Sequence, residues 1–134
     1  MKEFEQSGEE KNRIISEAWK LHSQGNLLEA AKYYQSFINK GFKDHRVYSN
    51  YGSILITQGK LKQAENFVRK AIELSPDNAI YYFNLGTILK DVDKIQEAEI
   101  SIQKAIELKP NYANAHFLLS NILIDQNKIE KALE

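Results

Sequence analysis

The chain contains no cysteine, and this absence removes three kinds of chemistry at once. Disulfide bonds, thiolate nucleophiles and cysteine-bound metals all need a sulfur that the sequence lacks. Such a composition fits a reducing compartment. Because the N-terminus also has no apolar stretch of signal-peptide length, we expect a cytoplasmic protein.

A surplus of charge of one sign and a long apolar run are lacking too. Lys plus Arg and Asp plus Glu number 18 each, so no overall field attracts nucleic acid or an anionic membrane. No stretch approaches the roughly 18 consecutive apolar residues that indicate a membrane span. Only two prolines occur, and 43% of the residues are hydrophobic, which is typical of a folded domain and not of a disordered tail. We therefore expect neither nucleic acid nor membrane as a partner.

An internal repeat is visible in the sequence. The segment Lys70–Leu74 followed by Pro76 recurs, 34 residues later, as Lys104–Leu108 followed by Pro110. A period of this length indicates stacked supersecondary units. It divides the domain, 11–134, into frames 11–44, 45–78, 79–112 and a truncated 113–134. Residues 1–10 form a flexible or helical extension before it.

Each frame has the pattern of two helices joined by a tight turn. One column of the repeat accepts the left-handed backbone that commonly follows a helix end. It contains Gly25, Gly59, Asp93 and Asn127. In the two middle frames a proline ends the second helix, because proline has no amide hydrogen and disfavours helix in the preceding residue.

Small residues recur where the two helices of a frame cross, since larger ones would push the helices beyond the roughly 8–10 Å of close packing. They are Ala18, Gly52, Gly86 and Ser120 on the first helices, Ala30, Ala64, Ala98 and Ala132 on the second, and Ala71 and Ala105 in a further column. The apolar fillers around them are Leu21, Tyr34, Leu55, Val68, Leu89, Ile102 and Leu123. We predict an all-α fold of helix pairs.

These columns resemble the tetratricopeptide repeat (TPR) family. Frame three has the pattern in its usual order, with Tyr82, Leu85, Gly86, Leu89, Ala98, Ile102, Ala105 and Pro110. Frame two matches with Tyr48, Tyr51, Gly52, Leu55, Ala64, Val68, Ala71 and Pro76. Frame one departs from it, with Phe37 and Phe42 where a small residue and a proline are usual. The resemblance covers about residues 11–134 and implies a right-handed α-solenoid of antiparallel helix pairs with a concave binding groove.

In such a stack the first helices line the groove. By frame position we predict a peptide-binding groove formed by Trp19, Arg46, Asn50, Phe83, Asn84, Thr87, Phe117 and Asn121, with Ile15, His22 and Ser49 among their neighbours. The exposed aromatic side chains are candidate energetic anchors, since truncating such a residue can cost on the order of 2 kcal/mol.

Asn50 and Asn84 occupy the same position in successive frames and resemble the asparagine ladder in the TPR domain of O-linked N-acetylglucosamine transferases. A carboxamide can pair with both the C=O and the N–H of an extended peptide. The alternative is that two asparagines merely lie on a polar face. Chaperone-binding TPR domains hold a C-terminal carboxylate with lysines, an arginine and asparagines. Only Asn50 matches that set, so we do not expect such a clamp.

No pattern of catalytic residues is present. The three histidines lie far apart and lack metal-ligand spacing. We expect His116 to be a packing residue, His45 to be solvated between frames, and His22 to project into the groove. The sequence has no glycine-rich phosphate loop and no nucleophile elbow. We expect no enzymatic activity, no cofactor and no metal.

The favoured function is a protein- or peptide-binding scaffold. Repeat stacks usually finish with a polar capping helix, and the last frame stops short of one. Two alternatives follow from this. The chain is the N-terminal recruiting or regulatory arm of a larger enzyme such as a transferase, or it is a scaffold that self-associates through its uncapped C-terminal end.

Overall fold

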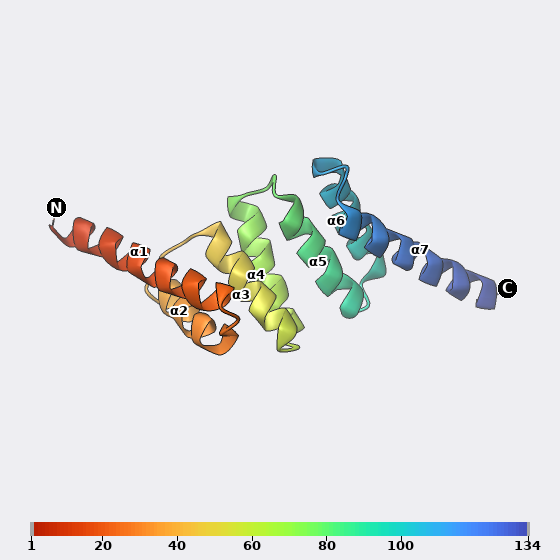
Figure 1. Ribbon diagram of the computed structural model, residues 1–134. Coiled ribbons are helices and arrows are strands. Elements are labelled where there is room, and N and C mark those ends of the chain that lie inside the picture. The colour runs from red at the N-terminus through yellow and green to blue at the C-terminus, as the bar shows by residue number, and fades with distance from the viewer. Residues whose placement is uncertain (1, 134) are drawn as a thin grey trace.

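The computed structural model describes the backbone of residues 2–133 and the side chains of residues 6–130 and 133. Within that range the chain forms seven helices and no strand. They are α1 (Lys2–Ser23), α2 (Leu27–Asn39), α3 (His45–Thr57), α4 (Leu61–Leu74), α5 (Ala79–Asp91), α6 (Ile95–Leu108) and α7 (Ala113–Leu133). Figure 1 shows them as a stack with the two chain ends at opposite sides. The predicted all-α solenoid is confirmed.

The three hairpin turns have one geometry, and it follows from the residue that was predicted to occupy each turn. Gly25, Gly59 and Asp93 have φ angles of 78°, 75° and 66°. Such left-handed residues let the next amide bond back to a carbonyl of the preceding helix. The amides of residues 26, 60 and 94 accordingly donate to the carbonyls of residues 21, 55 and 89 at 2.8–2.9 Å.

Side-chain caps start the first helices of the second and third hairpins. Asp44 accepts the backbone N–H of Arg46 at 2.8 Å, and Asn78 accepts that of Ile80 at 3.0 Å. Each cap satisfies an amide that has no partner within the helix. The two caps are one repeat apart, so α3 and α5 begin in equivalent places.

The core lies along the crossing points of the paired helices. Ala18, Ala30, Ala64 and Ala98 are fully buried, as are Tyr34 and Val68 among the fillers. Gly86 lies so close to Ala98 and Ile102 that an added Cβ would overlap the Ile102 side chain. In frame one Phe37 is fully buried and packs on Phe42 at 5.3 Å between ring centroids, so two aromatic rings replace the usual small residue and proline.

The turn predicted at Asn127 is wrong. α7 continues from Ala113 to Leu133 as one helix, so the expected second helix of frame four does not fold back. With no helix to cover them, Ser120 is exposed and Leu123 is 46% exposed, contrary to their predicted crossing and filler roles. The predicted crossing role of Ala132 lies outside the described side chains.

Residues 2–10, placed in an extension before the domain, are part of α1. Lys40 at the end of α2 pairs with Glu10 at 2.7 Å, which connects this part of α1 to the first hairpin. The charged group of Lys40 holds the pKa of Glu10 below its usual value.

Candidate functional site

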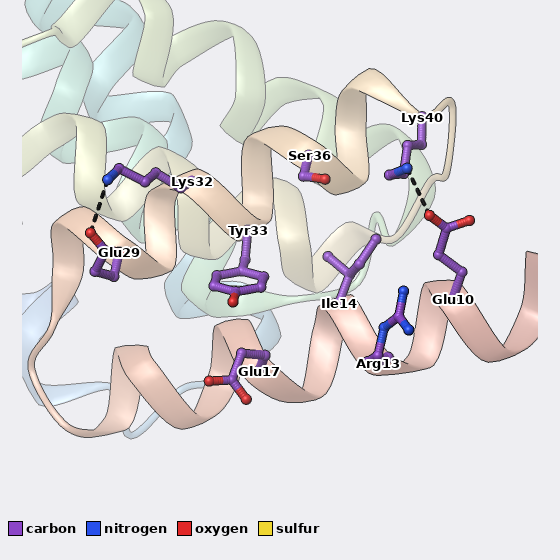
Figure 2. Close-up of a pocket in the computed structure, with 9 residues that line it drawn as sticks. All are labelled: Glu10, Arg13, Ile14, Glu17, Glu29, Lys32, Tyr33, Ser36 and Lys40. Atoms are coloured by element: carbon purple, nitrogen blue, oxygen red, sulfur yellow. Dashed lines mark hydrogen bonds and ion pairs between the residues drawn. The ribbon is translucent and has the colours of Figure 1, made fainter.

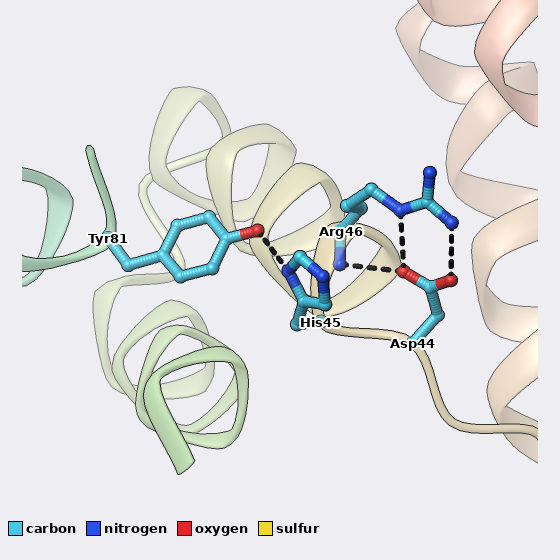
Figure 3. Close-up of polar contacts among 4 residues, drawn as sticks. All are labelled: Asp44, His45, Arg46 and Tyr81. Carbon is cyan, nitrogen blue, oxygen red and sulfur yellow. Dashed lines mark hydrogen bonds and ion pairs between the residues drawn. The ribbon is translucent and has the colours of Figure 1, made fainter. Parts of the chain in front are cut away.

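Two predicted groove residues, Trp19 of α1 and Arg46 of α3, contact each other. The Arg46 guanidinium lies 4.7 Å from the centre of the Trp19 ring, within the range of a cation–π interaction. Asp44 holds the same guanidinium, through Nε at 3.1 Å and a terminal nitrogen at 2.8 Å, as Figure 3 shows. Burial raises the pKa of Asp44, but the bonds from Arg46 outweigh that effect and leave the pKa below its ordinary value. The guanidinium of Arg46 is therefore held against the Trp19 ring, and its charge is balanced by the carboxylate of Asp44.

His45 connects successive hairpins and is not free in solvent as predicted. Its Nδ1 lies 2.6 Å from the hydroxyl of Tyr81 on α5, and the ring is half-buried (Figure 3). Burial, and next the Asp44 charge, raise the pKa of Tyr81.

The carboxamide of Asn50 belongs to a polar cluster that joins three helices. Burial raises the pKa of Tyr34 from α2, and a hydrogen bond from Asn50 of α3 acts in the opposite direction. His22 of α1 places its Nδ1 2.9 Å from the same hydroxyl. Burial lowers the pKa of His22. Sequence reasoning assigned Tyr34 to the core alone and missed that its hydroxyl reaches the groove residues.

Asn84 has the same helical position as Asn50 but a different neighbourhood. It is half-buried on α5. Among the described residues its side chain makes no hydrogen bond within the chain, and the residue one repeat after Tyr34 is the apolar Val68. Its carboxamide is therefore available to another molecule.

Aromatic and aliphatic side chains continue the surface towards α7. Phe83 is half-buried and packs on Tyr112 at 5.2 Å between ring centroids. Phe117 is 70% exposed and Ile80 is 51% exposed, so both offer apolar surface to a partner. Asn121 is half-buried on α7, in the same frame position as Trp19 and Thr87.

Some of the predicted groove residues contribute little to the surface. Ile15 and Ser49 are each only 6% exposed. The Thr87 hydroxyl donates to the carbonyl of Phe83 at 3.0 Å, so part of its hydrogen-bonding capacity is used within its helix. The groove therefore offers a partner less surface at Ile15, Ser49 and Thr87 than the frame positions predict.

All three histidines have structural partners. His116, predicted to be a packing residue, is exposed, and its Nε2 lies 2.7 Å from the carbonyl of Pro110. Tyr82, one frame earlier, donates its hydroxyl to the carbonyl of Pro76 at 2.9 Å. The two side chains thus repeat one connection between a helix and the preceding loop.

A polar cleft of about 590 Å³ lies elsewhere, between α1 and α2 (Figure 2). Its walls contain three acidic and three basic side chains, and Lys32 pairs with Glu29 at 2.9 Å there. Charges that are balanced in this way favour solvent over a ligand of one sign.

Among the described side chains, those of residues 6–130 and 133, no group of three or more His, Asp or Glu is placed to hold a metal ion. Within residues 2–133 none of the helices combines the length and the apolar character that a membrane crossing needs.

Solved structures with the same fold include several TPR proteins. A mutant of the O-GlcNAc transferase from Thermobaculum terrenum superposes with a TM-score of 0.77 at 23% identity over 87% of this chain. The chain spans 22% of the length of that transferase. The first TPR of Spaghetti, bound to an HSP90 peptide, gives 0.81 at 21% identity and covers 89% of this chain and 94% of its own.

The translocator chaperone SycD of Yersinia enterocolitica type III secretion gives a TM-score of 0.79 at 18% identity over 87% of this chain and 85% of its own. A search of curated proteins found no match. The model of one family, the Cilia and flagella-associated protein 70 middle TPR-like domain, matches residues 5–123. The chain therefore belongs to this family of TPR-like domains, whose fold is that of a protein-interaction scaffold.

Proposed function

We propose that the chain binds an extended peptide segment of a partner protein in the groove formed by α1, α3, α5 and α7. The observation that carries this proposal is the pair Asn50 and Asn84, at one helical position of α3 and α5. Both are half-buried, and the Asn84 carboxamide is unpaired within the described residues. Carboxamides in this arrangement can bond a peptide backbone regardless of its side chains.

The surroundings of the two asparagines favour a segment of low charge. The guanidinium of Arg46 is already matched by Asp44. At the end of α5, Lys90 and Asp91 are adjacent and of opposite sign. Phe83, Phe117 and Ile80 supply apolar contact area beside them. We therefore propose that binding does not depend on a C-terminal carboxylate of the peptide.

In this proposal the groove binds a peptide and catalyses no reaction. Each histidine is engaged with a tyrosine hydroxyl or a backbone carbonyl, so none is left as a general base beside a nucleophile. A role as the recruiting arm of a larger enzyme would use the same groove. The gene sequence beyond Glu134 tests that alternative, which a stop codon at that point would exclude.

The experiment compares two double variants. A peptide array identifies a bound segment, and fluorescence anisotropy then measures its dissociation constant. Asn50→Ala with Asn84→Ala should weaken binding roughly tenfold or more, because each lost backbone pairing costs about 1 kcal/mol. Asn39→Ala with Asn66→Ala is the matched control, since both side chains are exposed on second helices. Equal affinities for the two double variants would contradict the proposal.

Peptide termini provide the second measurement. The same peptide with a free and with an amidated C-terminus should bind with similar affinity. A large preference for the free acid would show that a carboxylate is recognised and that the groove works differently.

A further inference from the structure

α7 has the sequence of a first helix, a turn and the start of a second helix, but forms one straight helix. Residues 113–125 correspond to the first helices, and residues 128–133 (KIEKAL) correspond to the start of α6, residues 94–99 (KIQEAE). The three other hairpins turn at a residue with positive φ. At the equivalent position Asn127 is helical, so the two halves of the last hairpin point away from each other.

The first half of α7 lacks the cover that its counterparts have. Leu55 and Leu89 are each 1% exposed, because α4 and α6 fold back over them. Leu123, in the same frame position, is 46% exposed. Ser120 is exposed as well, whereas Gly52 and Gly86 are buried. A place for a second helix is therefore formed on α7 and left open.

The second half of α7 lacks a helix to pack on. Leu61 and Ile95, which begin α4 and α6, are half-buried against the core. Their counterpart Ile129 is 60% exposed, and Leu133 is 83% exposed. Figure 1 shows this end of α7 projecting away from the other helices.

We propose that two copies of the chain exchange these halves. Residues 128–133 of one copy lie along residues 113–125 of the other, and reciprocally, around a two-fold axis near residue 127. A hairpin opened at its turn can make the same contacts between copies that it would make within one, which is domain swapping. Leu123 of one copy then packs near Ile129 of the other, as the frame positions of Leu55 and Leu61 require.

A second copy is the occupant that the sequence fits. The segment with second-helix sequence is the chain's own, and the straight α7 holds it out of reach of its own first half. An antiparallel pairing about residue 127 also brings Asp125 of one copy beside Lys128 of the other. Both side chains are exposed in the single chain, and their charges are opposite.

Sedimentation velocity of the whole chain is the first test. The wild type should change from monomer to dimer across the micromolar range. Ile129→Lys should raise the dimer dissociation constant roughly tenfold or more, because the swapped contact would bury a charge. Leu28→Lys is the matched control: Leu28 is 69% exposed on α2, far along the chain from α7, and its change should leave the dimer unaffected. A wild type that is monomeric throughout would overturn the proposal.

Cysteine cross-linking is the second test, and the absence of natural cysteine makes it specific. Leu123→Cys and Ile129→Cys proteins, mixed and oxidised, should form a covalent heterodimer, whereas Leu123→Cys alone should not cross-link. In one straight helix these positions lie about 9 Å apart along the axis, too far for an internal disulfide. A chain that carries both Leu123→Cys and Ile129→Cys provides the contrary outcome. If this chain closes an internal disulfide as a monomer, α7 has folded back and the exchange is refuted.

Discussion

The two buried glycines, Gly52 and Gly86, occupy the same frame position but should respond oppositely to alanine. At Gly86 an added Cβ would lie 2.6 Å from Cγ1 of Ile102 and 3.3 Å from the carbonyl oxygen of Ala98. At Gly52 it would lie 3.0 Å from Cγ2 of Val68 and 3.5 Å from the carbonyl oxygen of Ala64. Besides its additional carbon, the Ile102 side chain lies closer to its glycine than Val68 does, and so does the backbone carbonyl of the second helix.

The magnitudes decide the sign at each site. Replacing glycine by alanine within a helix gains about 1 kcal/mol of helix propensity. Overpacking a core costs roughly 1–3 kcal/mol, and at Gly86 the helices or the Ile102 side chain must move to make room. We therefore expect Gly86→Ala to lower the free energy of unfolding by up to about 2 kcal/mol. Gly52→Ala, which needs only a small adjustment of Val68, should be neutral or stabilising by up to about 1 kcal/mol.

Urea unfolding followed by circular dichroism measures both variants. For an m-value of about 2 kcal/mol/M, the Gly86→Ala midpoint should fall by up to about 1 M. Ile102→Val should rescue Gly86→Ala by recreating the Gly52–Val68 pair, so the double-mutant cycle should show a favourable coupling of about 1 kcal/mol. Equal shifts for both glycines, or no coupling with Ile102→Val, would refute the steric reasoning.

Three further predictions concern caps, titration and turns. Asp44→Ala should lower the free energy of unfolding by about 1 kcal/mol, since the cap of α3 is lost. Because the pKa of Asp44 is depressed in the folded chain, its stabilising contribution is full above the usual carboxyl pKa and is lost as the pH falls through the folded pKa. Acid titration of the wild type and of Asp44→Ala, followed by unfolding, checks both statements. Burial lowers the pKa of His22, so the folded chain resists protonation there; stability should decline as the pH falls from about 7 to about 5, and thermal melts of His22→Gln should show a weaker decline. Asp93→Gly should raise the free energy of unfolding by about 0.5 kcal/mol, because glycine tolerates the φ of 66° better than aspartate. Gly59→Asp should lower it by a similar amount. The melting temperatures of the two variants check these changes.

The repeat made most of the fold predictable. Turns at Gly25, Gly59 and Asp93, crossing points at the buried alanines and helix ends before Pro76 and Pro110 all follow from local chemistry that repeats every 34 residues. The last frame was predicted wrongly, because a left-handed residue permits a turn without requiring one. A hairpin folds back only if the second helix buries enough surface. The described segment with the second-helix pattern, residues 128–133, is shorter than the 14 residues of α4 or α6.

The candidate site was less predictable than the fold. Frame position gave the helix on which Trp19, Arg46, Asn50 and Asn84 lie, but not their contacts. Those contacts depend on pairs far apart in sequence, such as Trp19 with Arg46 and His45 with Tyr81. No period links these residues, because they join one hairpin to the next. Capping was the one local signal: Asp44 stands one repeat before Asn78, and both accept the amide two residues on.

The two asparagines should therefore contribute unequally to binding, although their positions in the repeat are equivalent. The Asn50 side chain lies near enough to the Tyr34 hydroxyl to lower its pKa, whereas the residue one repeat after Tyr34, Val68, offers Asn84 no hydroxyl. A peptide must compete with Tyr34 for Asn50 but finds Asn84 free. Asn84→Ala should consequently lose more affinity than Asn50→Ala. The two dissociation constants should differ by a factor of a few, which corresponds to about 0.5–1 kcal/mol.

Tyr34→Phe separates this explanation from a simple difference in exposure. Removing the hydroxyl frees the Asn50 amide, so in that background Asn50→Ala and Asn84→Ala should lose similar affinity in anisotropy titrations. The same change should cost about 1 kcal/mol of stability through the lost bond to His22, and circular dichroism shows whether the fold persists. If Asn50→Ala still loses less affinity than Asn84→Ala in the Tyr34→Phe background, competition by the tyrosine is not the cause. The peptide path would then run closer to α5 than to α3.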